Sequence, residues 1–166
     1  MKLMQYLLFY FLLSFSPSSA QPVENAAYDL LLKGLLSHSV NEVSVKDIAN
    51  DTTILLLDAR EKREYEVSHI QHAVWVGYDD FNMSRVKNIG KETKIIVYCS
   101  VGYRSEKIAE KMKQAGYMHV SNLYGGIFEW KNQKQPVYHA TAKTNQVHAY
   151  SKTWGVWLNE GEKVYE

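Results

Sequence analysis

The sequence predicts an α/β protein in which a mostly parallel sheet of five strands carries helices on both faces. Two observations support this prediction. Short apolar, β-branched runs of the kind that form buried strands recur along the chain, and stretches with apolar residues at helical spacing separate them. Such alternation is typical of parallel strands joined by crossover helices. The expected strands cover residues 42–43, 53–57, 74–76, 94–98 and 119–122.

The helices are expected from apolar stripes and from helix-end signals. A stripe of leucines predicts a helix over residues 24–37. Ser44, followed three residues later by Asp47, predicts the capped start of a brief helix that runs to Ile48. The remaining helices are expected over residues 61–66, 81–88, 106–116 and 125–131.

Composition and charge narrow the class of protein. The chain has 166 residues, enough for one domain with an adequate core, and 46% hydrophobic with 22% charged residues is typical of a globular protein. A formal net charge of +1 without a basic patch argues against a nucleic-acid partner. The single cysteine excludes an internal disulfide.

That cysteine, Cys99, marks the candidate site. It stands at the tip of the strand over 94–98, on a short loop that leads into the helix over 106–116. A helix start presents unpaired N–H groups and the positive end of the helix dipole, and both favour a nucleophilic thiolate. Gly102 lets the loop curl around the sulfur. This placement favours a reactive cysteine over a small buried hydrophobe.

The residues after Cys99 are expected to bind the substrate. Arg104 supplies a forked cation suited to an anionic sulfur donor. Ser105 is expected to open the helix and to hydrogen-bond the loop. The whole set expected at the substrate is Ser100, Val101, Gly102, Tyr103, Arg104 and Ser105.

Three segments, together covering about residues 40–138, resemble the rhodanese family of single-domain sulfurtransferases. The first is the run from residue 55 to residue 61 with the downstream His69-Ile70, and the second is the Cys99 loop. The third holds Gly125-Gly126, Trp130 and Pro136-Val137. The resemblance implies a rhodanese-like sheet and a sulfurtransferase in which Cys99 carries a persulfide. Its donor would be a small sulfur-containing anion such as thiosulfate, and its acceptor a thiol or cyanide.

The resemblance also implies that Asp58 lies near the catalytic loop, at the carboxyl ends of the strands. Asp58 either orders that loop or caps the following helix, and Arg60 is expected to pair with a local acid and support the loop. His69 and His72 fall where a turn leads into a strand, so no metal site is expected there. No cofactor is expected either.

Two other classes of function remain open. A cysteine phosphatase or an arsenate reductase also closes a cysteine loop with an arginine. Such loops hold five residues between the two, however, whereas residues 100–103 are four. A persulfide carrier or rhodanese-like binding module that does not catalyse is compatible with every residue named above.

The chain is expected to divide into four segments. Residues 1–20 read as an export signal cleaved after Ala20 rather than as a membrane anchor, so the protein is expected to be periplasmic or secreted. Residues 21–39 form an N-terminal helical extension, 40–138 the rhodanese-like domain, and 139–166 an aromatic C-terminal tail. The tail is expected to pack on its own domain, and docking of a protein partner is the alternative.

Overall fold

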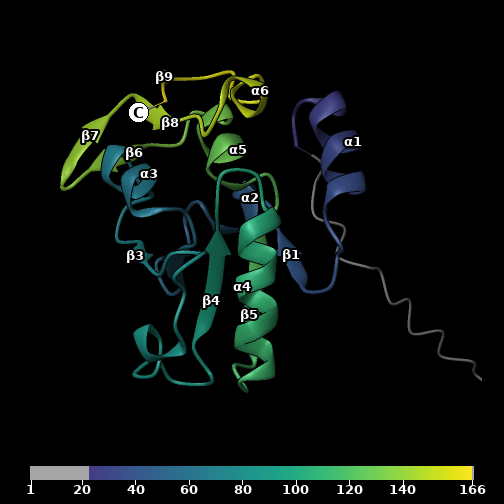
Figure 1. Ribbon diagram of the computed structural model, residues 1–166, viewed down its shortest axis with the longest axis vertical. Helices are drawn as coiled ribbons and strands as arrows, with labels where there is room; N and C mark the ends of the chain where they lie inside the picture. Colours follow the sequence, from purple (N-terminus) through teal and green to yellow (C-terminus); the bar gives the residue numbers. More distant parts are fainter. Residues whose placement is uncertain (1–22, 166) are drawn as a thin grey trace, which may run out of the picture.

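The computed structural model describes residues 23–165. The expected export signal over residues 1–20 lies outside them. In the described part, five parallel strands form one sheet in the order β1-β5-β4-β2-β3, which confirms the predicted fold class (Figure 1). The strands are β1 (Asn41–Val43), β2 (Leu55–Asp58), β3 (Val74–Trp75), β4 (Lys94–Tyr98) and β5 (His119–Leu123).

Side chains of the central strand β4 alternate between two hydrophobic layers, as the period of a strand requires. Ile96 and Tyr98 point into one layer, and Ile95 and Val97 into the other. The first layer is covered by α1 (Ala26–Leu35), α2 (Val45–Ile48) and α5 (Gly126–Asn132), and the second by α4 (Tyr103–Gln114). Helices therefore cover both faces of the sheet.

The parallel register brings the carboxyl ends of the strands to one edge of the sheet. Asp58 pairs with Tyr98 at the ends of β2 and β4, and β5 ends beside them. The short helix α3 (Lys62–Val67) follows β2 at this edge. Ligands of open parallel sheets bind at such an edge, and the Cys99 loop begins there.

The C-terminal tail forms small elements that pack back onto the domain above this edge (Figure 1). Val147, Ala149 and Leu158 are buried in the same core cluster as α1 and α5, and Trp157 stacks on Tyr28 with ring centroids 5.4 Å apart. The strand β6 (Val137–His139) leads into the tail, whose elements are β7 (Ala142–Thr144), β8 (Gln146–His148), α6 (Lys152–Gly155) and β9 (Glu162–Val164).

Two helix predictions differ from the structure. The helix expected over 81–88 is wrong, because only the 3-10 turn η1 (Met83–Arg85) forms there. In that stretch Val86 alone is fully buried, and a short helix without a packed face is not stable. The helix expected from residue 106 begins three residues earlier, at Tyr103, directly after Gly102. Among the described residues, no helix has the length and hydropathy needed to cross a membrane.

Candidate active site

Cys99 lies between the end of β4 and the start of α4, and its side chain is almost entirely buried, at 1% exposure. The backbone N–H of Gly102 donates to Cys99 Sγ over 3.1 Å. Gly102 has a φ of +122°, a conformation that other residues rarely adopt, and this turn carries its N–H back toward the sulfur. The first turn of α4 follows at once, so its unpaired N–H groups and dipole favour negative charge on the sulfur.

The start of α5 holds the backbone of this loop. The N–H of Ile127 donates to the carbonyl of Cys99 over 2.9 Å, and the N–H of Phe128 donates to that of Ser100 over 3.1 Å. Gly126 makes this approach possible, because its φ is +58° and a Cβ there would lie 2.4 Å from the Cys99 carbonyl oxygen. The Gly125-Gly126 pair thus lets helix and loop meet backbone to backbone.

Glu64 of α3 fixes the side chains on the other side of the loop. Its carboxylate is fully buried and accepts from Arg104 Nη1 over 2.6 Å and Nη2 over 2.8 Å. The hydroxyl of Ser100 also donates to it, over 3.1 Å. Burial alone would raise the pKa of Glu64, but the hydrogen bonds and charge of Arg104 lower it to about 2. Burial by itself would lower the pKa of Arg104. The hydrogen bonds and charge of Glu64 outweigh this effect, so the pKa of Arg104 is raised above its usual value.

Asp58 and Arg60 lie beside the loop without bonding to it. They form a fully buried pair in which Arg60 Nη2 donates to Asp58 Oδ2 over 2.6 Å. The backbone N–H of Arg60 also donates to Asp58, over 3.0 Å, and Arg60 Nη2 to the carbonyl of Ser68. The prediction that Arg60 pairs with a local acid is confirmed. Their expected support of the loop stays a prediction, since the hydrogen bonds named above join them to each other and to Ser68.

Ser105 does not reach the substrate side. Its hydroxyl is buried inside α4, where it lies 3.1 Å from the carbonyl of Gly102 and 2.7 Å from Asn122 Oδ1. Asn122 Nδ2 donates to the same carbonyl over 3.0 Å, so the end of β5 anchors the Gly102 turn. Ser105 therefore positions the loop rather than opening the helix, which begins at Tyr103.

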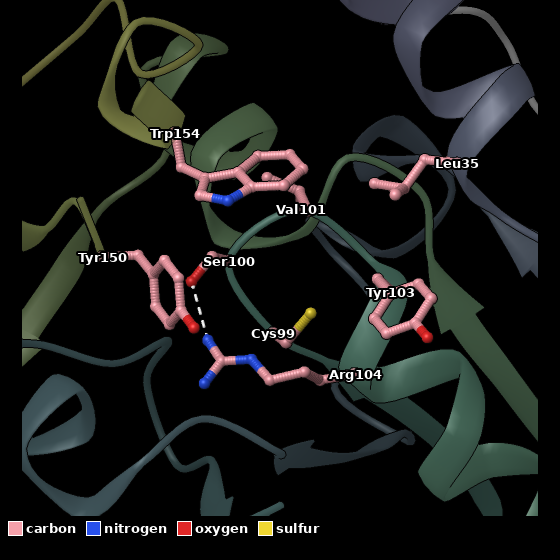
Figure 2. Close-up of a pocket in the computed structure, with 8 residues that line it drawn as sticks. All are labelled: Leu35, Cys99, Ser100, Val101, Tyr103, Arg104, Tyr150 and Trp154. Atoms are coloured by element: carbon pink, nitrogen blue, oxygen red, sulfur yellow. Dashed lines mark hydrogen bonds between the residues drawn. The ribbon is translucent and has the colours of Figure 1, made fainter. Parts of the chain in front are cut away.

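A pocket of about 210 Å³ opens above Cys99 (Figure 2). The loop supplies part of its wall, as the sequence indicated. The remaining wall comes from α1 and from the C-terminal tail, where the ring of Tyr150 lies 5.0 Å from the guanidinium carbon of Arg104. The lining residues are Leu35, Cys99, Ser100, Val101, Tyr103, Arg104, Tyr150 and Trp154.

Sequence reasoning missed five residues of this site. Asn122 lies next to the end of β5, which is parallel to the strand before Cys99, so its position near a strand end was a usable signal. Glu64 lies in the short helix α3 after β2, and its only signal was its place near the run that carried the resemblance. The other three, Leu35, Tyr150 and Trp154, offered only aromatic or apolar character. Among the described residues, no group of three or more His, Cys, Asp or Glu side chains is placed to hold a metal ion.

Apart from Asn41, the residues that form the sheet and the Cys99 loop fall within a match to a family model. The Rhodanese-like domain matches residues 42–133, which is more than half of the chain. The chain therefore belongs to the rhodanese-like family, whose members include sulfurtransferases.

Among curated relatives, the chain is similar to proteins named tRNA uridine(34) hydroxylase. The one from Hamiltonella defensa is 31% identical over 137 residues, which cover 80% of this chain and 36% of that protein. The one from Enterobacter sp. (strain 638) is 34% identical over 91 residues, covering 52% of this chain and 26% of that protein. The chain thus spans between about a quarter and just over a third of the length of these relatives.

Solved structures agree on the fold. A Bacillus halodurans protein superposes with a TM-score of 0.56 at 28% identity and covers 70% of this chain and 88% of its own. The polysulfide-sulfur transferase homodimer from Wolinella succinogenes superposes with a TM-score of 0.53 at 17% identity, over 68% of this chain and 88% of its own. At that identity the second likeness concerns the fold alone.

Proposed function

We propose that this protein is a sulfurtransferase that carries sulfane sulfur from a small donor to a thiophilic acceptor as a Cys99 persulfide. The observation that carries the proposal is the placement of Cys99 Sγ. It lines an open pocket while it accepts the N–H of Gly102 at the start of α4. A sulfur in that position has both an anion-stabilising backbone and access to a small molecule.

Transfer proceeds in two displacements. With thiosulfate as donor, the Cys99 thiolate attacks the outer sulfur, an Sγ–S bond forms, and the S–S bond of thiosulfate breaks as sulfite leaves with its electron pair. The persulfide keeps the single negative charge of the thiolate, and the Gly102 N–H remains positioned to stabilise it. Cyanide or a thiolate then attacks the outer sulfur and returns the Cys99 thiolate. These steps require neither a metal nor a cofactor.

The geometry supports this reaction better than phosphate chemistry. In a phosphatase or reductase of the cysteine-arginine type, the arginine must hold the oxyanion inside the loop. Here both terminal nitrogens of Arg104 point at Glu64 (2.6 and 2.8 Å). The loop is also one residue shorter, with four residues between Cys99 and Arg104.

The intact mass of the protein tests the proposal. After incubation with thiosulfate, the wild-type protein is expected to gain one sulfur atom and to lose it when cyanide is added. Cys99→Ser is expected to remain folded and to gain none, because backbone contacts rather than the thiol hold the loop. Sulfur transfer by Cys99→Ser would overturn the nucleophile assignment. If the wild-type persulfide forms but transfers its sulfur to no acceptor, the protein is a persulfide carrier rather than a sulfurtransferase.

The names of the curated relatives raise hydroxylation of a tRNA uridine as a second activity, which belongs to proteins of which the matched part of this chain covers only about a quarter to just over a third. The formal net charge of +1 does not favour an RNA partner.

We also propose that the protein is exported, with residues 1–20 as the signal and a periplasmic or secreted product. The same intact mass tests export, since a product starting at Gln21 is expected and an uncleaved chain in the cytoplasm would contradict it.

A further inference from the structure

We propose that the pocket above Cys99 selects a sulfur donor with an apolar, ring-sized group next to the transferable sulfur. This inference rests on the proposed function and names its substrate class. Three observations carry it: the charge of the pocket, the chemistry of its walls and its volume.

Within residues 23–165, which the structure describes, the pocket offers no unpaired cation to a dianion such as thiosulfate. The loop side chains between Cys99 and Arg104 are a serine, a valine, a glycine and a tyrosine, none of them cationic. Arg104 lines the wall, but its charge is balanced by Glu64. The pKa of Glu64 is about 2, so its carboxylate is ionised at neutral pH. A donor that enters the pocket therefore loses hydration without gaining a new ion pair, and this cost grows with its charge.

The walls of the pocket are mostly apolar or aromatic. Val101 and Tyr103 belong to the loop and the start of α4, whereas Leu35 comes from α1 and Tyr150 and Trp154 come from the tail. Figure 2 shows these side chains arranged around the sulfur of Cys99, with Trp154 and Leu35 on opposite sides. Leu35, Tyr150 and Trp154 lie outside the family match over residues 42–133. Three of the five apolar or aromatic wall residues thus come from segments that the matched domain does not include.

The volume limits the group to about one ring. The pocket measures about 210 Å³. Apolar cavities of roughly 150 Å³ accept benzene, whereas sites for drug-sized ligands have roughly 300–1,000 Å³. A single ring with its sulfur fits this space, and a larger molecule would protrude from it.

Benzenethiosulfonate combines these properties and serves as the probe. The Cys99 thiolate attacks its terminal sulfur and forms the Sγ–S bond. The bond from that sulfur to the sulfonyl sulfur breaks, and its electron pair leaves with benzenesulfinate. One negative charge enters with the donor and one leaves with the sulfinate. Methanethiosulfonate reacts in the same way and has the same charge, but it carries a methyl group in place of the ring that would touch the walls.

The experiment compares kcat/KM for these two donors, with cyanide as acceptor, in the wild type and in Trp154→Ala. The kcat/KM for benzenethiosulfonate divided by that for methanethiosulfonate is expected to be about tenfold lower in the variant than in the wild type. Comparing this ratio between the two proteins cancels the intrinsic reactivity of each donor. Val156→Ala is the matched control, because Val156 lies two residues further along the tail and is 59% exposed. Its ratio is expected to equal that of the wild type.

Leu35→Ala removes the opposite wall and is expected to lower the same ratio, which keeps the test valid if Trp154→Ala does not fold. An unchanged ratio in the folded wall variants would overturn the inference while leaving the sulfurtransferase proposal intact. Failure of every donor, thiosulfate included, to load sulfur onto Cys99 would overturn the proposed function itself.

Discussion

Replacing Glu64 by glutamine removes the one buried negative charge that fixes Arg104 beside the loop. Glutamine has nearly the same shape but brings an amide NH₂ against the donors of Arg104, which then lose an acceptor. The pKa of Glu64, lowered from 4.5 to about 2, corresponds to roughly 3 kcal/mol of preference for the ionised form in the folded protein. We therefore expect Glu64→Gln to lower the free energy of unfolding at pH 7 by about 3 kcal/mol, or the melting temperature by roughly 6–12 °C.

The pH dependence gives this prediction its sharpest test. Because the folded-state pKa of Glu64 is depressed, its contribution is complete above the unfolded pKa of 4.5 and is lost as the pH falls toward 2. The glutamine variant lacks this titration. The gap in stability between wild type and variant should thus be widest at neutral pH and should narrow as the pH falls below 5.

Urea unfolding followed by circular dichroism at several pH values measures the gap. Glu66→Gln is the matched control on the same helix, because Glu66 is 61% exposed and lies 3.9 Å from Lys62. It is expected to change stability by less than about 0.5 kcal/mol. A gap for Glu64→Gln that is the same at pH 7 and pH 3 would refute the assignment of Glu64 as an ionised tether.

Three further predictions concern the loop itself. Arg104→Lys loses the fork that holds both Glu64 oxygens, and because Glu64 balances the charge of Arg104, loading from thiosulfate and discharge of a preformed persulfide to cyanide should slow by the same factor; a selective slowing of loading in single-turnover assays would mean that Arg104 contacts the donor directly. Gly126→Ala, whose Cβ would lie 2.4 Å from the Cys99 carbonyl oxygen, should cost at least about 2 kcal/mol in urea unfolding, whereas Gly34→Ala, with open space around it, should be neutral or stabilising. Cys99, at 1% exposure, should react with iodoacetate much faster than with bulky maleimides at neutral pH, and unfolding should abolish the difference; equal native rates would exclude a sheltered thiolate.

The sequence by itself determined the sheet and the position of Cys99 at the end of a strand. Both follow from local signals, since a buried β-branched run predicts β4 and the following glycine and helix predict the turn at Cys99. The capping box at Ser44 is equally local, and the structure confirms it. The prediction of a helix over residues 81–88 was wrong, because a short helix needs a packed face and in this stretch only Val86 is buried.

Only the tertiary structure decided which side chains meet at the cysteine. Asp58 ends β2 and Glu64 lies in the helix that follows, yet the fold pairs Asp58 with Arg60 and Glu64 with Arg104, which is 40 residues away. Leu35 and Trp154 lie on opposite sides of Cys99 in the sequence and line the same pocket with it in the structure. Such meetings depend on how the helix and the tail pack over the edge of the sheet. Local propensity and hydrophobic period carry no information about that packing.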